Sequence, residues 1–345
     1  MGARPQFIKA AAVSNVFSKH FDEILVHTGQ HYDANMSDVF FEELGIPKPK
    51  YHLNIGSGSH GAMTGAMLAA IEDVLLSEKP DFVMVYGDTN STIAGALAAS
   101  KLLIPVIHVE AGLRSFNKAM PEEQNRILTD HISDLLFVPT QTAIDNLTTE
   151  GIQKGVHNVG DVMYDGILHF TGMAKEKSTI LETLGVKENA FLLCTIHRAE
   201  NTNDVNRLKG IIDGLNAVSE TIVLPLHPRT QKYLSDYKIE LNPNIKVIEP
   251  VGYLDMVRLE AGAKKIVTDS GGVQKEAYFL AKPCITMRDE TEWVETVENG
   301  WNIIVGADAS KIRNAIENFS PTTERKDYFG NGTAALQMVE LIKNH

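Results

Sequence analysis

Cysteine is scarce in this sequence, which has only two cysteines, Cys194 and Cys284, among 345 residues. Both stand in apolar runs, which is typical of small buried thiols rather than of disulfide halves and favours a reducing compartment such as the cytoplasm. Basic residues are also few, because 32 Lys and Arg stand against 44 Asp and Glu, a formal net charge of −12. This balance argues against a nucleic-acid-binding protein, but a few local arginines and helix N-termini can still bind a small anion.

Long apolar runs and several common site motifs are absent as well. No apolar stretch approaches the length that spans a membrane, which argues against an integral membrane protein. The sequence contains neither a Gly-x-Ser-x-Gly nucleophile elbow nor a P-loop lysine motif. Its histidines and cysteines lack the spacing of metal ligands, so we expect no metal site.

What the sequence does have is a regular alternation of short β-branched runs and longer helical patterns. This alternation predicts an α/β fold with parallel sheets covered by helices. About ten parallel strands is long for one open sheet, so we expect two sheets. The expected strands are Glu23–His27, Phe82–Tyr86, Val106–Val109 and Leu135–Val138, followed by Phe191–Thr195, Ile222–Leu226, Lys246–Ile248, Lys265–Thr268, Pro283–Met287 and Asn302–Val305.

The two series of strands predict two domains. The polar, helical-looking stretch at Phe170–Gly185 separates the series. We therefore expect an N-terminal domain over residues 1–168 and a second domain over 169–322. The remaining segment, 323–345, contains the amphipathic stretch Thr333–Lys343, for which we expect a helix that packs back on the first domain.

Polar side chains follow seven of the expected strands. Ligands of open parallel sheets bind beyond the carboxyl ends of the strands. Each end also has a plain alternative: Asp88, for example, either caps the helix that follows it or faces a ligand. Seven caps are a poor explanation, and two sheets facing a cleft would bring all seven ends to one ligand. The segments are Thr28–His31, Gly87–Thr89, Glu110–Gly112, His197–Asn201, His227–Arg229, Asp269–Gly272 and Arg288–Asp289.

One of these segments and the start of the chain are candidate anion sites. In the segment 269–276, Gly271 and Gly272 stand at a strand-to-helix turn, where the backbone can approach a pyrophosphate; Glu276 follows one turn later. A plain tight turn is the alternative, and this is not the Gly-x-Gly-x-x-Gly fingerprint of dinucleotide-binding proteins. Near the start of the chain, Arg4 and Lys9 flank a predicted helix N-terminus, or are simply two surface cations.

Acidic and histidine side chains complete the candidates. Glu122 and Glu123 open a predicted helix, where acidic residues also suit the helix dipole, and only one of the two can face a cleft. Histidines inside elements, His108 and His131, are expected to be structural. Those just past strand ends and beside arginines, His197 and His227, are expected to be functional.

In combination these motifs resemble the non-hydrolysing UDP-N-acetylglucosamine 2-epimerases, in the family's order and over nearly the whole chain. This resemblance implies two Rossmann-like domains facing each other across a cleft, the GT-B arrangement. The matching segments are Gly2–Pro5 with Lys9, His27–His31, Gly87–Thr89, His108–Arg114, Pro121–Arg126, His197–Asn201, His227–Pro228, Asp269–Glu276 and Met287–Glu292.

The resemblance implies a reaction and the residues for it. UDP is eliminated across C1–C2 of the sugar to leave a 2-acetamidoglucal, and it adds back after protonation of the other face of C2, which requires acid–base groups and partners for the pyrophosphate. The implied catalytic residues are Asp88, Glu110, Glu122 and His197. The implied UDP-binding residues are Arg4, Lys9, His227, Ser270, Gly271, Gly272, Glu276 and Arg288. No cofactor and no metal are implied.

The resemblance also implies a cellular setting, and the sequence departs from the family pattern in two respects. It implies a cytoplasmic homodimer that supplies cell-surface polysaccharide biosynthesis, with a UDP-sugar and neither nucleic acid nor membrane as partner. Family members carry an apolar strand ahead of the Gly-x-Arg-Pro loop, so the first strand is expected to be missing here. Ala3 and Gln6 are typical of a branch acting on UDP-2,3-diacetamido-2,3-dideoxyglucuronate.

Other readings of the same motifs remain open. A GT-B glycosyltransferase, a hydrolysing epimerase and an inactive nucleotide-sugar sensor would share the fold and the UDP site. Some members bind a second UDP-sugar as an activator, at a place that resembles the neighbourhood of Gln30 and His31. Those members carry an arginine where this chain has the glycine-rich stretch 56–61. Without that arginine we expect weak activation or none.

Overall fold

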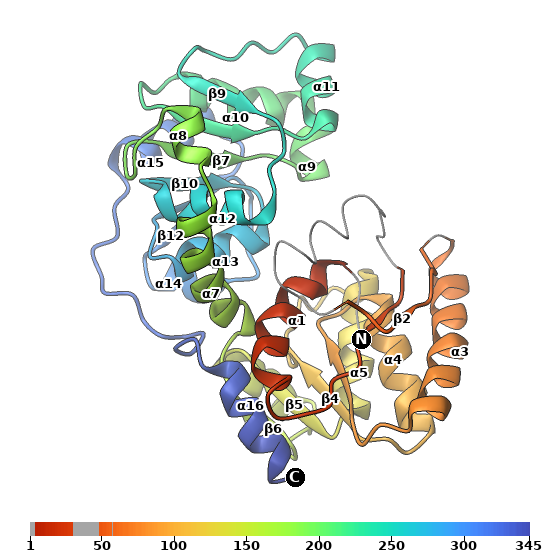
Figure 1. Cartoon of the computed structure of the whole chain (residues 1–345). Helices are drawn as coiled ribbons and strands as arrows, with labels where there is room; N and C mark the ends of the chain where they lie inside the picture. Colours follow the sequence, from red (N-terminus) through yellow and green to blue (C-terminus); the bar gives the residue numbers. More distant parts are fainter. Residues whose placement is uncertain (1–3, 30–47, 57) are drawn as a thin grey trace. The chain divides into compact units, whose positions relative to one another are not determined.

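The computed structural model describes residues 4–29, 48–56 and 58–345, so Gln30 and His31 of the expected activator site lie outside the described residues. The chain divides into two compact units: unit 1 comprises Met1–Leu168 and Asp327–His345, and unit 2 comprises His169–Lys326. Both alternate strands with helices (Figure 1), and helix α7 (Val162–Lys177) contributes residues to each. Across the described ranges, no helix is long and apolar enough to cross a membrane.

Unit 2 is built on a six-stranded parallel sheet with the order β12-β11-β10-β7-β8-β9. Counted from β7 as the first strand, this is the order 6-5-4-1-2-3 of a doubly wound nucleotide-binding fold. The strands are β7 (Leu192–Thr195), β8 (Ile222–Pro225), β9 (Ile245–Ile248), β10 (Lys265–Thr268), β11 (Cys284–Thr286) and β12 (Asn302–Ile304). The helices are α8 (Ile180–Leu184), α9 (Ala199–Thr202), α10 (Val205–Asn216), α11 (Pro228–Asp236), α12 (Tyr253–Gly262), α13 (Gly271–Phe279), α14 (Val294–Glu298) and α15 (Ala309–Asn318).

Apolar side chains cover both faces of this sheet. Leu192 and Cys194 of β7 pack into one buried cluster, whereas Leu193, between them, packs into another. This alternation follows from the two-residue period of a strand. Cys194 and Cys284 are both free and buried, as the sequence predicted.

Unit 1 contains two groups of parallel strands. One has the order β1-β2 and the other the order β3-β4-β5-β6. The strands are β1 (Val26–His27), β2 (Tyr51–His52), β3 (Val83–Tyr86), β4 (Val106–Val109), β5 (Leu135–Val138) and β6 (Val156–Asn158). The helices are α1 (Arg4–Phe17), α3 (His60–Glu78), α4 (Asn90–Lys101), α5 (Pro121–Ile132), α6 (Gln141–Thr149) and α16 (Ala334–Lys343), besides the first part of α7. Two parallel α/β units thus agree with the predicted fold class.

A largely apolar cavity of about 340 Å³ separates the two groups of strands in unit 1. Residues 22–26, which lead into β1, line it, and so do residues 82–84 and Tyr86 at β3. Phe17, at the end of α1, and Leu75, in α3, close it further. In unit 2 the corresponding position lies between β8 and β10, and β7 fills it. Among the described residues of unit 1, β1 is paired with β2, and β3 is paired with β4. No strand pair of this part of the chain joins the two groups across the cavity.

The C-terminal helix α16 packs within unit 1, against α1. Its first N–H groups donate to the carboxylate of Asp165 in α7, from Ala334 N at 3.1 Å and from Ala335 N at 2.9 Å. A carboxylate at a helix N-terminus satisfies backbone donors that have no partner inside the helix. Burial, the largest effect, raises the pKa of Asp165 despite these hydrogen bonds.

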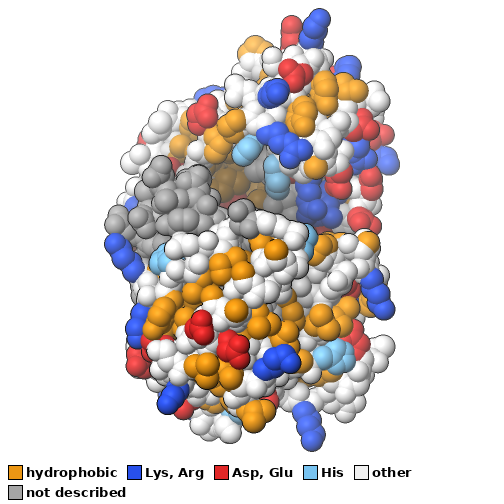
Figure 2. Space-filling model, turned by 90° about the vertical axis from the view of Figure 1, so that its right-hand side faces the viewer, with side chains coloured by type: hydrophobic (Ala, Val, Ile, Leu, Met, Phe, Trp, Pro, Cys, Tyr) orange, Lys and Arg blue, Asp and Glu red, His pale blue; other side chains and the backbone are white. Residues whose placement is uncertain are grey.

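One helix of unit 1 presents an apolar face to solvent. Along α3 the exposed positions include Ala62, Ala66 and Ala69, with Leu76 at 55% exposure. Figure 2 shows hydrophobic side chains gathered on this side of unit 1. Apolar surface of this kind often marks an interface.

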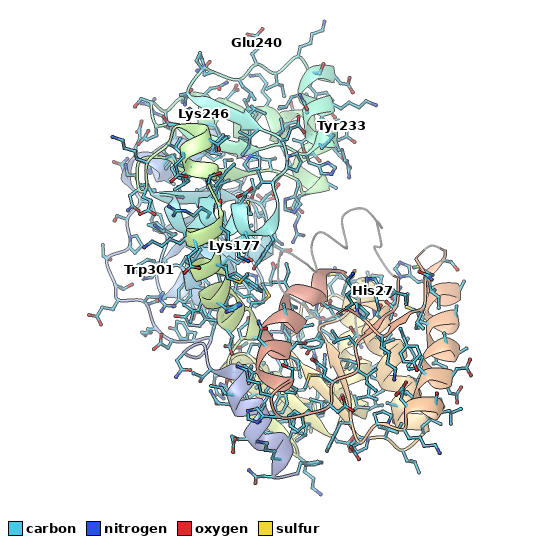
Figure 3. The ribbon with its side chains drawn as sticks, in the orientation of Figure 1. His27, Lys177, Tyr233, Glu240, Lys246 and Trp301 are labelled. Carbon is cyan, nitrogen blue, oxygen red and sulfur yellow. The ribbon has the colours of Figure 1, made fainter. Side chains whose placement is uncertain are left out.

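His27, at the carboxyl end of β1 (Figure 3), lies against a histidine of the neighbouring strand β2. The ring of His27 stacks on that of His52, in β2, with centroids 5.2 Å apart. Burial, together with the neighbouring His52, lowers the pKa of His27 to about 4. His27 is therefore neutral at physiological pH, and its Nδ1 accepts the Gly29 N–H at 2.9 Å.

Candidate functional site

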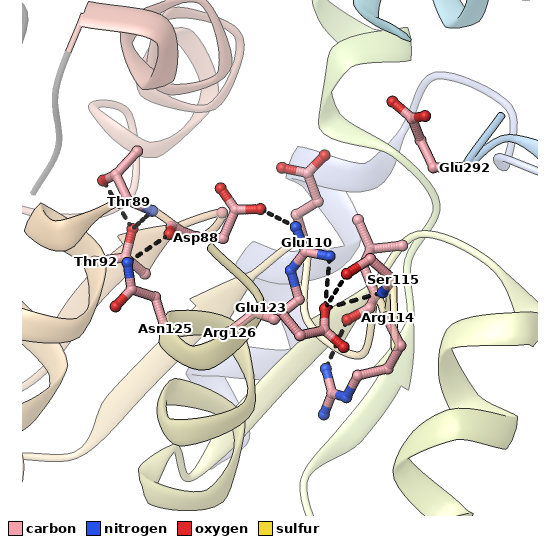
Figure 4. A network of polar contacts seen from close by, with 12 residues as sticks. Asp88, Thr89, Thr92, Glu110, Arg114, Ser115, Glu123, Asn125, Arg126 and Glu292 are labelled. Carbon is pink, nitrogen blue, oxygen red and sulfur yellow. Dashed lines mark hydrogen bonds and ion pairs between the residues drawn. The ribbon is translucent and has the colours of Figure 1, made fainter. Parts of the chain in front are cut away.

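Asp88 lies two residues past the end of β3 but does not cap the next helix. The N-cap of α4 is Thr89, which forms a capping box with Thr92. The carboxylate of Asp88 instead forms an ion pair with Arg126, from α5, and is 32% exposed (Figure 4). Asn125 of the same helix donates to the Asp88 carbonyl at 3.0 Å. Asp88 is thus a positioned and accessible carboxylate.

Glu110 ends β4 in an unusual backbone conformation. Its φ is +71°, in the left-handed region that non-glycine residues rarely occupy. The Glu110 N–H bonds to the Phe137 carbonyl at 3.0 Å, and the side chain forms an ion pair with Lys9 of α1. The carboxylate is 9% exposed and the ammonium 18%. Backbone strain of this kind clusters at functional sites.

The two glutamates that open α5 have different environments. Glu123 is buried, and it accepts the backbone N–H groups of Ser115 and Phe116, each at 2.9 Å. Burial alone would raise its pKa, but these hydrogen bonds and Arg126 outweigh it and lower the pKa. Glu122 is exposed. Glu123 is therefore a structural anchor of the 115–116 loop, and Glu122 is the member of the pair that can reach a ligand.

In unit 2, a buried aspartate organises the segment after β7. Asp269 accepts the backbone N–H of His197 at 3.1 Å and that of Arg198 at 3.0 Å. Its other contacts are Asn201 Nδ2, at 3.1 Å, and His197 Nδ1, at 3.4 Å. The His197 ring is 53% exposed, so it is anchored on one side and open on the other.

The N-terminus of α13 has the expected glycine turn. Ser270 is the N-cap and accepts the Val273 N–H at 3.4 Å. A Cβ atom on Gly271 would lie 2.1 Å from Glu292 Oε1, so a side chain there would collide with its neighbour. Gly272 is exposed, and Glu276, one turn on, is buried. Free N–H groups at such a turn form an anion site.

Two further predicted UDP-binding residues lie in unit 2. His227 is the N-cap of α11, where its Nδ1 accepts the Arg229 N–H at 3.2 Å, and it is exposed. Arg288 follows β11, is 7% exposed and donates to Glu292 at 2.7 Å. The structure therefore gives His227 a helix-capping role, which the sequence analysis did not predict.

The predicted site residues are divided between the two units. Lys9, Asp88, Glu110 and Glu122 belong to unit 1; His197, His227, Ser270, Gly271, Gly272, Glu276 and Arg288 belong to unit 2. Arg4 opens α1, and its side chain lies outside the described residues. In the ranges 4–29, 48–56 and 58–345, no three histidine, cysteine, aspartate or glutamate side chains gather as metal ligands.

The sequence analysis missed the partners of these residues. Arg126 stands in a matched segment without an assigned role, yet it holds Asp88. Asp269 was assigned only to a polar strand end, yet it holds the backbone of His197. Both partners are distant in sequence from the residue they hold, and no local pattern signals such pairs.

Comparison with known proteins gives consistent matches. Residues 16–343 match the family model described as UDP-N-acetylglucosamine 2-epimerase. A Methanococcus maripaludis protein named "UDP-N-acetylglucosamine 2-epimerase homolog" is 57% identical over 100% of this chain and 98% of its own. The UDP-2,3-diacetamido-2,3-dideoxy-D-glucuronate 2-epimerase of Pseudomonas aeruginosa is 52% identical over 99% and 98%.

A solved structure is similar along the whole chain. The crystal structure of Methanocaldococcus jannaschii UDP-GlcNAc 2-epimerase in complex with UDP-GlcNAc and UDP aligns with a TM-score of 0.86. It is 47% identical and covers 99% of this chain and 98% of its own.

Proposed function

This chain belongs to the UDP-N-acetylglucosamine 2-epimerase family, and from that premise we propose that it interconverts UDP-N-acetylglucosamine and UDP-N-acetylmannosamine. The fold and the family match support an enzyme that inverts C2 of a UDP-linked sugar. A second candidate substrate is UDP-2,3-diacetamido-2,3-dideoxyglucuronate, which the name of the 52% identical Pseudomonas relative favours.

The proposed reaction proceeds by elimination and re-addition. A base removes the proton from C2, the electron pair of that C–H bond forms the C1–C2 double bond, and UDP leaves C1 with the electrons of the C1–O bond. Protonation of the opposite face of C2 and attack of a UDP oxygen on C1 then give the epimer. Such a cycle requires positioned acid–base groups and partners for the departing pyrophosphate.

The observation that carries the proposal is the pair of carboxylates on neighbouring strand ends of unit 1. Asp88 and Glu110 follow β3 and β4, which pair directly, and each is held by a cation from a different helix. Together with Glu122 and His197 we assign them the acid–base roles at C2. Their fixed orientation supports this, because acid–base catalysis depends on geometry first.

We assign the UDP moiety to the strand ends of unit 2. The turn Ser270–Gly272 offers N–H groups to the pyrophosphate, and Glu276 offers a carboxylate to the ribose hydroxyls. His227 and Arg288, with Arg4 and Lys9 of unit 1, complete the proposed UDP-binding set. The complex of the Methanocaldococcus relative with UDP-GlcNAc and UDP supports binding of a UDP-sugar by this family.

We also propose that the protein is a homodimer that covers the apolar face of α3. Exposed Ala66 and Leu76 lie on this helix, and an arginine at position 66 would place a charge on the face. Light scattering should then give a dimer mass for the native protein and a monomer mass for Ala66→Arg. A monomeric native protein would exclude the dimer.

The substrate is tested by supplying each UDP-sugar separately and following the anomeric protons by NMR. We expect epimerisation of UDP-N-acetylglucosamine with the higher kcat/KM, and UDP that stays sugar-bound at equilibrium. Turnover of the diacetamido-glucuronate alone would reassign the substrate. Net release of UDP, or transfer of the sugar to an acceptor, would instead indicate a hydrolysing epimerase or a glycosyltransferase.

A further inference from the structure

His108 lies inside β4 with no solvent exposure, and both of its ring nitrogens contact oxygen atoms. Nε2 is 2.8 Å from the carbonyl oxygen of Gly87, and Nδ1 is 2.7 Å from Oδ1 of Asp130, in α5. A carbonyl oxygen can only accept a hydrogen bond, so Nε2 carries a proton. The charge of the ring then depends on whether Nδ1 carries one as well.

The surroundings of Asp130 settle the second proton. Its Oδ2 accepts the Gly112 N–H at 3.1 Å and an Arg114 N–H at 2.7 Å, which are contacts of an ionised carboxylate. Because Asp130 is ionised, it has no proton to give, and Nδ1 must donate.

These charges belong to a connected set of charged side chains, in which Glu150 is 26% exposed and also lies 3.6 Å from His131 Nε2. His108 and Arg114 are the cations, and Asp130 and Glu150 are the anions. Arg114 is 1% exposed and donates from Nε and Nη2 to the two oxygens of Glu150, each at 2.7 Å. Paired and hydrogen-bonded charges of this kind are stable in an interior, whereas removal of one partner is costly.

This charge set joins the turns that carry two of the proposed catalytic carboxylates. Gly87, which accepts from His108, immediately precedes Asp88. Gly112 and Arg114, which donate to Asp130, follow Glu110 closely. Gly87 and Gly112 have φ values of +61° and +78°, a region that glycine enters freely, so the backbone conformation alone does not fix these turns.

We propose that His108 donates from both ring nitrogens, as an imidazolium, and so fixes the Asp88 turn relative to the Glu110 turn, which makes it a positioning residue for C2 inversion. The inference rests on the proposed function for the roles of Asp88 and Glu110. His108 itself does not exchange a proton with the sugar, because it is completely buried and both of its N–H groups are occupied.

The charge state is tested on the native protein by NMR of the chain labelled with ¹⁵N-histidine. The signals of His108 are identified by their loss in His108→Asn, and exposed His20 provides a solvent-accessible ring for comparison. We expect both ring nitrogens of His108 to carry protons at pH 7. A ring nitrogen without a proton would overturn the inference. This result does not depend on turnover, so it is separable from failure of the proposed function.

The positioning role is tested by kinetics of His108→Asn, with His20→Asn as a control for the same change on the surface. An asparagine side chain cannot donate to Gly87 and Asp130 at once. A displaced catalytic group costs about a hundredfold in rate, so we expect kcat to fall by about that factor. The affinity for UDP, whose proposed contacts are mostly in unit 2, should stay within about twofold. A kcat unchanged in His108→Asn would overturn the positioning role.

Discussion

The ammonium group of Lys9 forms an ion pair with the carboxylate of Glu110, although 101 residues separate them in the sequence. Lys9 lies in α1 and Glu110 at the end of β4, and both side chains are largely buried. Gln6, one turn earlier in α1, donates to the carbonyl of Tyr86 at the end of β3. The first turns of α1 therefore hold the carboxyl ends of two neighbouring strands.

This contact gives Lys9 a role as the cation that positions Glu110, in addition to the UDP-binding role proposed for it. We expect Lys9→Met to lower kcat by about tenfold or more, because it leaves a buried carboxylate without its cation. Steady-state kinetics and a UDP titration measure the two effects separately, and Lys9→Arg, which keeps the charge, should lose less. If UDP affinity falls while kcat is unchanged, Lys9 serves the pyrophosphate and not Glu110.

The proposed acid–base residues should each be needed for turnover. We expect Asp88→Asn, Glu110→Gln and Glu122→Gln to lower kcat by about a hundredfold or more, as for other positioned acid–base groups. UDP binding, measured by calorimetry, should change little. Asp236→Asn, at an exposed position near the end of α11, makes the same change of charge and should leave kcat unaltered. Near-native turnover in all three variants would contradict the site assignment.

Glu260, in α12, makes stability depend on pH. It is 1% exposed, and burial, followed by the charge of Glu276, raises its pKa well above the ordinary value. Above about pH 4.5 the folded chain keeps a proton that the unfolded chain releases, so this residue lowers the free energy of unfolding as pH rises. Glu260→Gln should remove that cost.

Urea unfolding at two pH values tests this expectation. The gain in the free energy of unfolding for Glu260→Gln should be about 1–3 kcal/mol at pH 8, the usual size of the desolvation penalty of a buried polar group, and smaller at pH 5. Glu240→Gln, at an exposed position, is the matched control (Figure 3). An equal effect of Glu260→Gln at both pH values would contradict the proposed protonation.

We expect an extended apolar segment placed in the cavity between β1 and β3 to stabilise unit 1. In unit 2 the equivalent position is taken by β7, whose residues are all buried. Fusion of about six apolar, β-branched residues ahead of Met1, the usual length of a strand, should raise the Tm. A Gly-Ser extension of the same length is the control. Equal Tm values for both extensions would contradict this expectation.

Most strands were predictable because buried parallel strands are short apolar runs. The prediction of Lys246–Ile248 differs from β9 by one residue, Ile245. The sequence analysis missed β2 and β6, which are two and three residues long and include His52 and Asn158. Short strands with polar residues lack the apolar run that identifies the others.

The site was predictable in its residue types but not in its contacts. The segment after β3 left two roles open for Asp88, and only the structure shows that Thr89 is the cap. The pairs Asp88–Arg126 and Lys9–Glu110 depend on packing between distant helices and strand ends. Local periodicity contains no information on such pairs.

The central claim is inversion at C2 through loss and return of its proton, with UDP retained. Incubation of the protein with UDP-N-acetylglucosamine in deuterium oxide, followed by NMR at C2, tests it most directly. We predict that UDP-N-acetylmannosamine appears with deuterium at C2, and that UDP remains attached to sugar at equilibrium. Epimer without deuterium at C2, or UDP released without re-addition, would contradict the account.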